Sequence, residues 1–174
     1  MQQLLKKLET IPMSLNVIKT HAPKKCRVIL YDRLPNSVET LFGSNNSVII
    51  LYQIHDKSGN NKNGIGHFSL VMRTPNSKKI RYFSSYGFKP EEEIHLTHSK
   101  GKLLKLLGKN YESNRVRFQD LQKTETCALH CLVRAYLWKI PQTKYLQLMK
   151  KIFLKTPDDI VSCLTLLLVL NELQ

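Results

Sequence analysis

Two residues of this chain have the type and the local setting that nucleophilic catalysis needs, one cysteine and one histidine. Cys127 follows a polar lead-in, Glu125-Thr126, and precedes a long apolar run, so we expect it at the start of a buried helix. The N–H groups and the dipole of a helix start stabilise negative charge, which favours a thiolate over a thiol. His67 follows Gly64-Ile-Gly66 at the head of a strand-like run. If the fold brings the two side chains together, they can act as a nucleophile and its base.

The elements that must position these residues can be predicted from the hydrophobic pattern. Strands are expected at Cys26–Tyr31, Val48–Ile54, His67–Met72, Lys79–Phe83 and Arg115–Gln119. Helices are expected at Gln2–Ile11, Leu103–Gly108, Cys127–Pro141, Gln142–Leu154 and Thr156–Leu173. The pattern therefore predicts an α+β fold. A small mixed sheet packs against a central buried helix that carries the cysteine, a helical C-terminal block follows, and residues 1–174 form a single domain.

The chain is strongly basic. Its 174 residues include 27 Lys and Arg against 13 Asp and Glu, which gives a formal net charge of +14. Such an excess favours a polyanionic partner, such as nucleic acid bound through its phosphates without sequence preference. A lysine-rich solvated surface would give the same composition, so the charge alone leaves both interpretations open.

Cysteine usage and hydropathy indicate an intracellular, soluble type of protein. The four cysteines are too few and too scattered for a disulfide scaffold, so we expect free thiols in a reducing compartment. The longest apolar run, Leu166–Leu170, is far shorter than the roughly 20 residues that cross a bilayer. The N-terminal segment lacks a secretory pattern. We therefore expect no membrane partner.

Taken singly, a histidine before a strand and a cysteine at a helix start are more often structural than catalytic. A metal site is a further alternative, because Cys127, His130 and Cys131 fall on one predicted helical turn. That turn supplies at most three ligands, and no second pair has zinc-finger spacing. We therefore expect no metal and no other cofactor.

Four segments, in this order, resemble the adenovirus-type maturation proteases, a clan that includes the SUMO-specific proteases. The pattern of that family is a glycine-histidine at a strand start, an acid about seventeen residues later, a glutamine, and a cysteine that opens the central helix. The matching segments are Gly66-His67-Phe68, Phe83-Ser84-Ser85-Tyr86-Gly87, Gln119, and Cys127-Ala-Leu-His-Cys-Leu132. Together with Tyr31–Pro35 and Leu41-Phe42, they look closest to the proteases of virophages and Maverick-type transposons, over residues 28 to 140.

The resemblance implies a role for each matching residue. Cys127 would be the nucleophile, His67 the base, and Gln119 the oxyanion donor, with Gln122 as the alternative glutamine. Ser84 would stand where the family has its acid, because it follows His67 by 84 − 67 = 17 residues. A serine hydroxyl can accept the same hydrogen bond but adds no charge. Phe68 and Ala128 replace a tryptophan and a glycine of the family pattern.

The resemblance also implies a function and a fold. The fold would be papain-like, with a circularly permuted order in which histidine precedes cysteine. The activity would be that of a monomeric cysteine endopeptidase that cuts viral capsid precursors during virion maturation, in the virion interior and in the host cytoplasm or virus factory. Viral DNA would be a non-specific partner and stimulator. Two alternatives stay open: a protease for ubiquitin-like modifiers, and an inactive basic virion or nucleic-acid-binding protein, which Ser84 favours.

Overall fold

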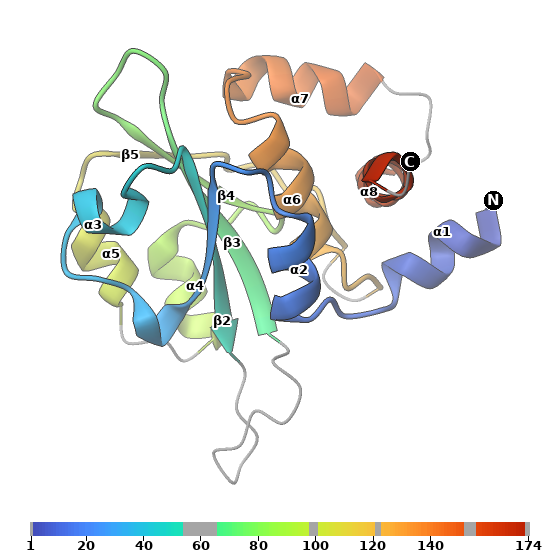
Figure 1. The fold of residues 1–174 in the computed structure, drawn as a ribbon, viewed down its shortest axis with the longest axis horizontal. Helices are drawn as coiled ribbons and strands as arrows, with labels where there is room; N and C mark the ends of the chain where they lie inside the picture. Colours follow the sequence, from blue (N-terminus) through green and yellow to red (C-terminus); the bar gives the residue numbers. More distant parts are fainter. Residues whose placement is uncertain (1, 54–65, 98–100, 121–122, 152–155, 173–174) are drawn as a thin grey trace, which may run out of the picture.

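A computed structural model describes residues 2–53, 66–97, 101–120, 123–151 and 156–172 (Figure 1). Its centre is a five-stranded sheet in the order β1-β2-β3-β4-β5, in which β1 pairs in parallel with β2 and β4 with β5, while both central pairings are antiparallel. The strands are β1 (Cys26–Leu30), β2 (Ser47–Gln53), β3 (Gly66–Arg73), β4 (Ile80–Ser84) and β5 (Tyr111–Ser113). The mixed sheet confirms the predicted α+β class.

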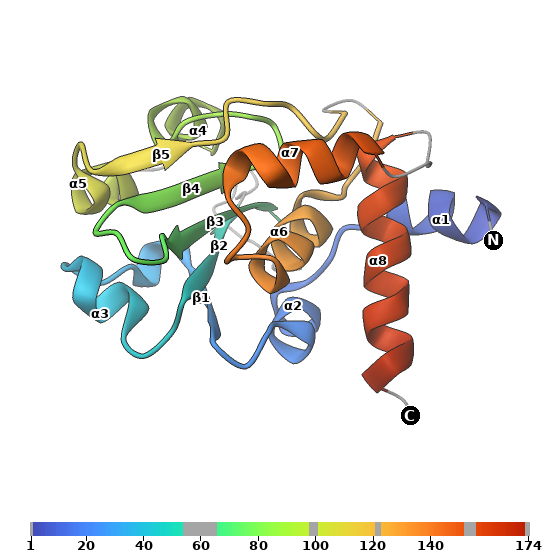
Figure 2. The same ribbon diagram turned by 90° about the horizontal axis from the view of Figure 1, so that it is seen from above.

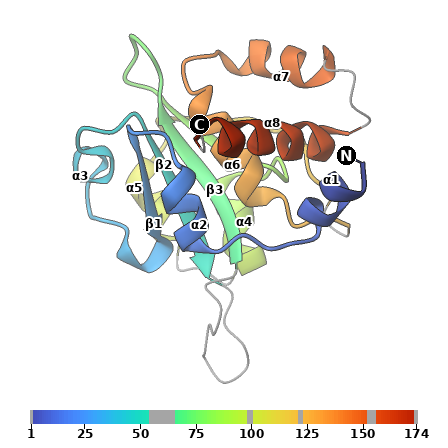
Figure 3. The same cartoon turned by 45° about the vertical axis from the view of Figure 1, so that its right-hand side comes forward.

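Helices cover both faces of the sheet (Figures 1 and 2). One face carries α2 (Leu15–His21) and α6 (Cys127–Tyr136), and the other carries α3 (Val38–Phe42), α4 (Pro90–Thr97) and α5 (Lys102–Leu107). A short 3-10 helix, η1 (Tyr31–Arg33), follows β1. Three further helices pack beyond α6, as Figure 3 shows: α1 (Gln2–Glu9), α7 (Gln142–Lys151) and α8 (Pro157–Glu172). The helix that begins at Cys127 thus lies between the sheet and the C-terminal block.

The core has two layers because successive side chains of a strand point to opposite faces of the sheet. In β2, Ile49 and Leu51 pack on the α6 side, whereas Val48, Ile50 and Tyr52 pack on the side of α3 and α5. This two-sided burial agrees with the nearly continuous apolar sequence of the strand. In β3 the same alternation turns the even-numbered residues towards α6 and the odd-numbered ones towards α3, α4 and α5.

The predicted strand at Arg115–Gln119 is wrong. The last strand of the sheet is β5, which lies earlier, at Tyr111–Ser113, and the chain leaves the strand conformation at Arg115, whose φ is 50°. Just before that point, the Asn114 side chain takes the place of a strand partner for Ser84. Its amide accepts from Ser84 N–H and donates to Ser84 O, at 3.0 and 2.8 Å.

Three helices of the structure, α2, α3 and α4, were not predicted from the sequence. α2 and α3 are short and begin at serine N-caps, Ser14 and Ser37, whose hydroxyls accept hydrogen bonds from the first turn of each helix. α4 begins at Pro90 and carries three glutamates in its first turn. Proline and acidic residues at a helix start are recognisable signals, so α4 could have been predicted.

Among the described residues, no helix is long and apolar enough to cross a membrane. Cys26, Cys127, Cys131 and Cys163 are all free thiols, as predicted.

Gly87 allows the chain to turn after β4, and we predict that Gly87→Ala destabilises the protein more than Gly43→Ala. Both glycines have positive φ, 75° and 52°, so each alanine pays about 1–2 kcal/mol for the left-handed conformation. A Cβ at Gly87 would also lie 2.8 Å from the carbonyl carbon of Val116, whereas one at Gly43 meets nothing within 4 Å. Urea unfolding of both variants measures the difference, which we expect to be about 1–3 kcal/mol. Equal losses would contradict the close packing of this turn.

Candidate active site

Cys127 is the first residue of α6 and is 5% exposed. Thr126 precedes it as the N-cap residue, but its side chain makes no capping hydrogen bond. The N–H groups at this helix start are therefore not occupied by the cap side chain that usually accepts from them. The Cys127 thiol lies 4.0 Å from the carbonyl oxygen of Gly66, the residue next to His67. The structure thus brings together the two segments that the sequence singled out.

His67 lies at the start of β3, on the face of the sheet that α4 covers, and is 3% exposed. Its ring stacks on Tyr86, with 4.6 Å between the ring centroids and 17° between the planes. The register explains this contact. Ser69 pairs with Ser84 at the end of β4, and the antiparallel course beyond this pair brings His67, two residues before Ser69, opposite Tyr86, two residues after Ser84. The imidazole is therefore held by the sheet and by one aromatic neighbour.

The hydrogen-bond partner of His67 is Glu93. The distance between His67 Nε2 and Glu93 Oε1 is 2.9 Å, and the carboxylate is fully buried. Its other oxygen accepts a hydrogen bond from the Tyr82 hydroxyl of β4. Burial and the charge of Glu93 raise the pKa of Tyr82, so this residue stays a neutral donor. Sequence reasoning missed Glu93 because it missed α4, although Pro90 and the run of glutamates signal that helix.

Ser84 does not take the place that the family resemblance implied. It is fully buried, and its hydroxyl has no hydrogen-bond partner in the described part of the chain. The register gives the reason, because Ser84 lies opposite Ser69 and not opposite His67. A diagonal neighbour in a sheet is about 7–8 Å away, beyond the reach of a serine hydroxyl. Glu93, with its longer side chain on α4, fills this position instead.

Charge around His67 favours the imidazolium. Burial is the largest single effect and lowers the pKa of His67, but the charges and hydrogen bonds of Glu93 and Cys127 together outweigh it, and the pKa rises from 6.5 to about 10. The neighbouring Cys127 also raises this pKa, through a hydrogen bond and its charge. Nδ1 itself has no partner with good hydrogen-bond geometry among the described residues. The thiol is thus close enough to shift the pKa of His67 without a well-formed hydrogen bond to Nδ1.

Gln119 is buried in the segment that leads into α6. Its side-chain oxygen accepts from the Ser85 hydroxyl at 2.7 Å, and its side-chain nitrogen donates to Thr124 O at 2.8 Å. These bonds fix the orientation of the amide and use one of its two N–H groups. The alternative donor, Gln122, lies outside the described residues.

A second buried histidine–carboxylate pair joins α6 to α8. His130 of α6 and Asp158 of α8 are 3.0 Å apart, and the histidine is fully buried. The sequence raised His130 only as a metal ligand, and the described residues contain no group of three or more His, Cys, Asp or Glu that could hold a metal ion. No local signal connects His130 to Asp158, because the contact depends on how α8 packs against α6.

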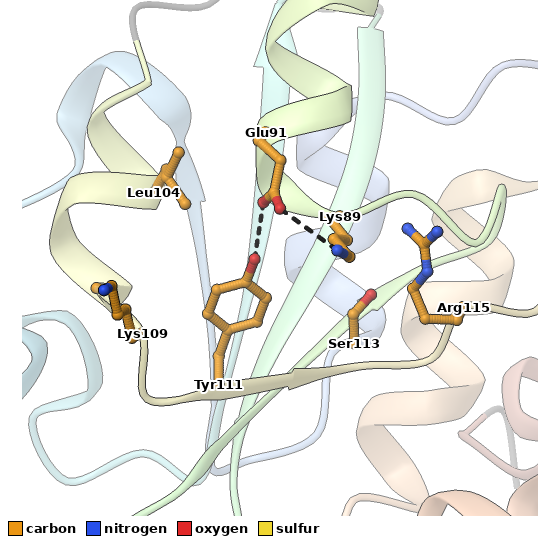
Figure 4. A pocket seen from close by; sticks show the side chains of 8 residues that line it. Lys89, Glu91, Leu104, Lys109, Tyr111, Ser113 and Arg115 are labelled. Carbon is orange, nitrogen blue, oxygen red and sulfur yellow. Dashed lines mark hydrogen bonds and ion pairs between the residues drawn. The ribbon is translucent and has the colours of Figure 1, made fainter.

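A pocket of about 430 Å³ lies apart from these residues, between α4, α5 and β5 (Figure 4). Its lining carries three cationic side chains, Lys89, Lys109 and Arg115. Tyr111 donates to Glu91 at 2.7 Å across the pocket, and Lys89 lies 3.8 Å from the same carboxylate (Figure 4). None of the predicted site residues lines this pocket, so it is separate from the candidate active site.

Comparison with known proteins adds no assignment. No family model matches the chain, and no curated protein or solved structure matches it either. The chemistry of the site therefore has to be argued from its own geometry.

Replacing the carboxylate should reverse the charge preference of His67. In Glu93→Gln, we expect the His67 pKa to fall from about 10 towards 6.5, because burial is then opposed by Cys127 alone. NMR titration of the His67 Cε1–H resonance, assigned with His67→Gln, measures both values. In the wild type the folded state binds this proton more tightly than the unfolded state. The resulting stabilisation is complete below pH 6.5 and is lost as the pH rises through about 10.

The same linkage can be checked by urea unfolding at several pH values. Between pH 7 and pH 10 the free energy of unfolding should fall more steeply for the wild type than for His67→Gln. Parallel curves, or a wild-type His67 that titrates near 6.5, would contradict the paired imidazolium.

Proposed function

We propose that the chain is a cysteine endopeptidase of the adenovirus type, with Cys127 as nucleophile, His67 as base and Glu93 as the residue that orients and charges the base. The observation that carries the proposal is the position of His67. Its Nε2 is bonded to a buried carboxylate while the thiol at the start of α6 lies beside it. A nucleophile, a base and an orienting third group are the parts that this chemistry requires. The proposed fold is papain-like with a circularly permuted active-site order, because His67 precedes Cys127.

The proposed reaction proceeds through a thioester. His67 holds the proton as an imidazolium before substrate binds, and Cys127, as its paired thiolate, attacks the carbonyl carbon of the scissile peptide. The imidazolium then donates that proton to the leaving nitrogen, the C–N bond breaks, and the acyl group stays on sulfur. Water, deprotonated by His67, attacks the thioester carbonyl, and the second product leaves as a carboxylic acid while the thiol is restored. Glu93 stabilises the imidazolium in the steps in which His67 carries the proton, because its buried carboxylate hydrogen-bonds Nε2.

The oxyanion of the tetrahedral intermediate would be stabilised by the backbone N–H of Cys127 and the side-chain amide of Gln119. Fixed donors act strongly in a site that excludes water, because they need no reorganisation when the charge develops. The bonds from Ser85 and to Thr124 give the Gln119 amide this fixed orientation. Gln119 is therefore the glutamine we assign to this role.

The proposed substrates are viral capsid precursor proteins, cut in the virion interior and in the host cytoplasm or virus factory. This part of the proposal is supported by the sequence resemblance. The net charge of +14 suits an enzyme that works as a monomer while held by non-specific viral DNA. DNA would then act as a stimulator and not as a cofactor in the chemistry.

The two alternative functions, an inactive virion protein and a protease for ubiquitin-like modifiers, are not equally supported. An inactive, basic virion protein was favoured by Ser84, and that support is gone because Glu93 supplies the missing carboxylate. A protease for ubiquitin-like modifiers would use the same three groups, so it differs only in its substrate. A vinyl-sulfone derivative of ubiquitin or SUMO separates the two, because only a modifier-specific protease would be labelled at Cys127.

Glu93, and not Ser84, should determine activity. We predict that Glu93→Gln lowers kcat/KM roughly 10²-fold or more, because a general base that has lost its orienting charge also loses much of its contribution. Ser84→Ala is the matched control, since this hydroxyl is buried and makes no hydrogen bond within the described residues. The measurement is cleavage of the co-encoded capsid precursors by each purified variant.

Cys127→Ala sets the background in the same assay and should leave the precursors uncut. A wild type that gives the same uncut products as Cys127→Ala would reject the protease proposal. A loss of activity in Ser84→Ala equal to that in Glu93→Gln would reject the assignment of Glu93.

A further inference from the structure

A buried polar cluster connects the first residues of α6 to the first turn of α8. Asp158 accepts hydrogen bonds through Oδ1 from the Thr126 hydroxyl and from His130 Nε2, the latter at 3.0 Å. Its Oδ2 accepts the N–H of Asp120 at 3.3 Å. Thr126 directly precedes the nucleophile and Asp120 directly follows Gln119. One carboxylate therefore holds both the residue after Gln119 and the residue before Cys127.

Thr126 occupies the position at which a threonine normally caps a helix. A capping hydroxyl accepts a hydrogen bond from an N–H of the first turn, and the capping residue has an extended backbone. Here the hydroxyl donates to Asp158 instead, and the backbone of Thr126 has φ −90° and ψ 6°. The side chain caps none of the N–H groups at the start of α6.

This arrangement matters because the same N–H groups can serve either a cap or an anion. A side-chain oxygen that accepts from them takes up the donors and part of the positive potential of the helix start. A thiolate on Cys127, and later an oxyanion at its backbone N–H, would then compete with that oxygen. A helix usually gains stability from its N-cap, so the missing cap lowers the stability of α6. A role in binding an anion gives a reason for this loss, whereas a purely structural role gives none.

We propose that Asp158 is a positioning residue that keeps the Thr126 hydroxyl away from the start of α6, so that its N–H groups remain available to the Cys127 thiolate and to the oxyanion. The role given to Asp158 rests on the proposed function, whereas the alkylation test below does not need peptidase activity. Asp158 binds the Thr126 hydroxyl, which therefore does not reach the helix start. His130 donates to the same oxygen of Asp158 and holds the carboxylate in this orientation.

A merely structural role for Asp158 gives different expectations. In that case the cluster only attaches α8 to α6, and its loss lowers stability without a specific effect on the thiol. Asp159→Ala is the matched control for such an effect. Asp159 is the next residue of α8 and forms the capping bonds with Thr156, at 2.8 to 3.1 Å, so its loss weakens the same helix start without touching Thr126.

The test is the rate at which iodoacetamide alkylates Cys127 at pH 7, followed by mass spectrometry of the Cys127 peptide. In Asp158→Ala the freed Thr126 can adopt the extended backbone of a capping residue and turn its hydroxyl to the helix, and we expect alkylation to slow about fivefold, the size of a helix-terminus charge effect. Thr126→Val has no hydroxyl to cap with and should stay within about twofold of the wild type. The double variant Thr126→Val/Asp158→Ala should therefore recover most of the lost rate. Asp159→Ala should lower the melting temperature and leave the rate unchanged.

Thr126→Asn keeps the test decisive if Asp158→Ala does not fold. Asparagine is a strong neutral capping residue, so this variant should slow alkylation without lowering the melting temperature. Two results would overturn the inference: a double variant as slow as Asp158→Ala, or an unchanged rate in both Asp158→Ala and Thr126→Asn. Because alkylation needs no peptide substrate, a wild type without peptidase activity would reject the proposed function and leave this test intact.

Discussion

The buried pair of His67 and Glu93 is the interaction on which the rest of the site depends. A buried carboxylate is costly unless it is paired and hydrogen-bonded, and a buried imidazole would otherwise be neutral. Each group removes the penalty of the other, and the Tyr82 hydroxyl satisfies the remaining carboxylate oxygen. His67 comes from β3, Tyr82 from β4 and Glu93 from α4, so the contact forms only when these three elements pack together. The charge on His67 therefore depends on the packing of this whole face of the sheet.

The proposed nucleophile, Cys127, comes from the opposite layer. α6 packs on the other face of the sheet, and its first residue approaches the end of β3 at Gly66. A Cβ at Gly66 would lie 1.9 Å from the carbonyl oxygen of Tyr52, so only glycine fits between the two strands before the histidine. The two layers thus supply different parts of the proposed site: one carries the charged His67, and the other carries the helix start with Cys127. Asp158 then connects that helix start to α8.

The sequence predicts those features of the site that depend on neighbouring residues, and it does not predict those that depend on contacts between distant elements. The positions of Cys127 at a helix start and of His67 at a strand start were predicted correctly, because both kinds of start leave signals in the neighbouring residues. Glu93 was not found, because its role arises from a contact between α4 and β3 across 26 residues of sequence. Ser84 had the expected spacing from His67, but spacing does not give register, and the register places Tyr86 opposite the histidine. The failed strand prediction at Arg115–Gln119 has a similar cause, since the alternating pattern there is interrupted by the positive φ of Arg115.

The central claim is that His67 and Cys127 act as one unit. The most direct measurement is the rate of Cys127 alkylation between pH 5 and pH 9, compared with that of His67→Gln. A thiol without a partner reacts about tenfold faster with each pH unit below its pKa, whereas a thiolate held beside an imidazolium reacts at a rate that changes little with pH. We predict a plateau that extends below pH 7 in the wild type and a steep rise in His67→Gln. The same steep rise in both proteins would contradict the account.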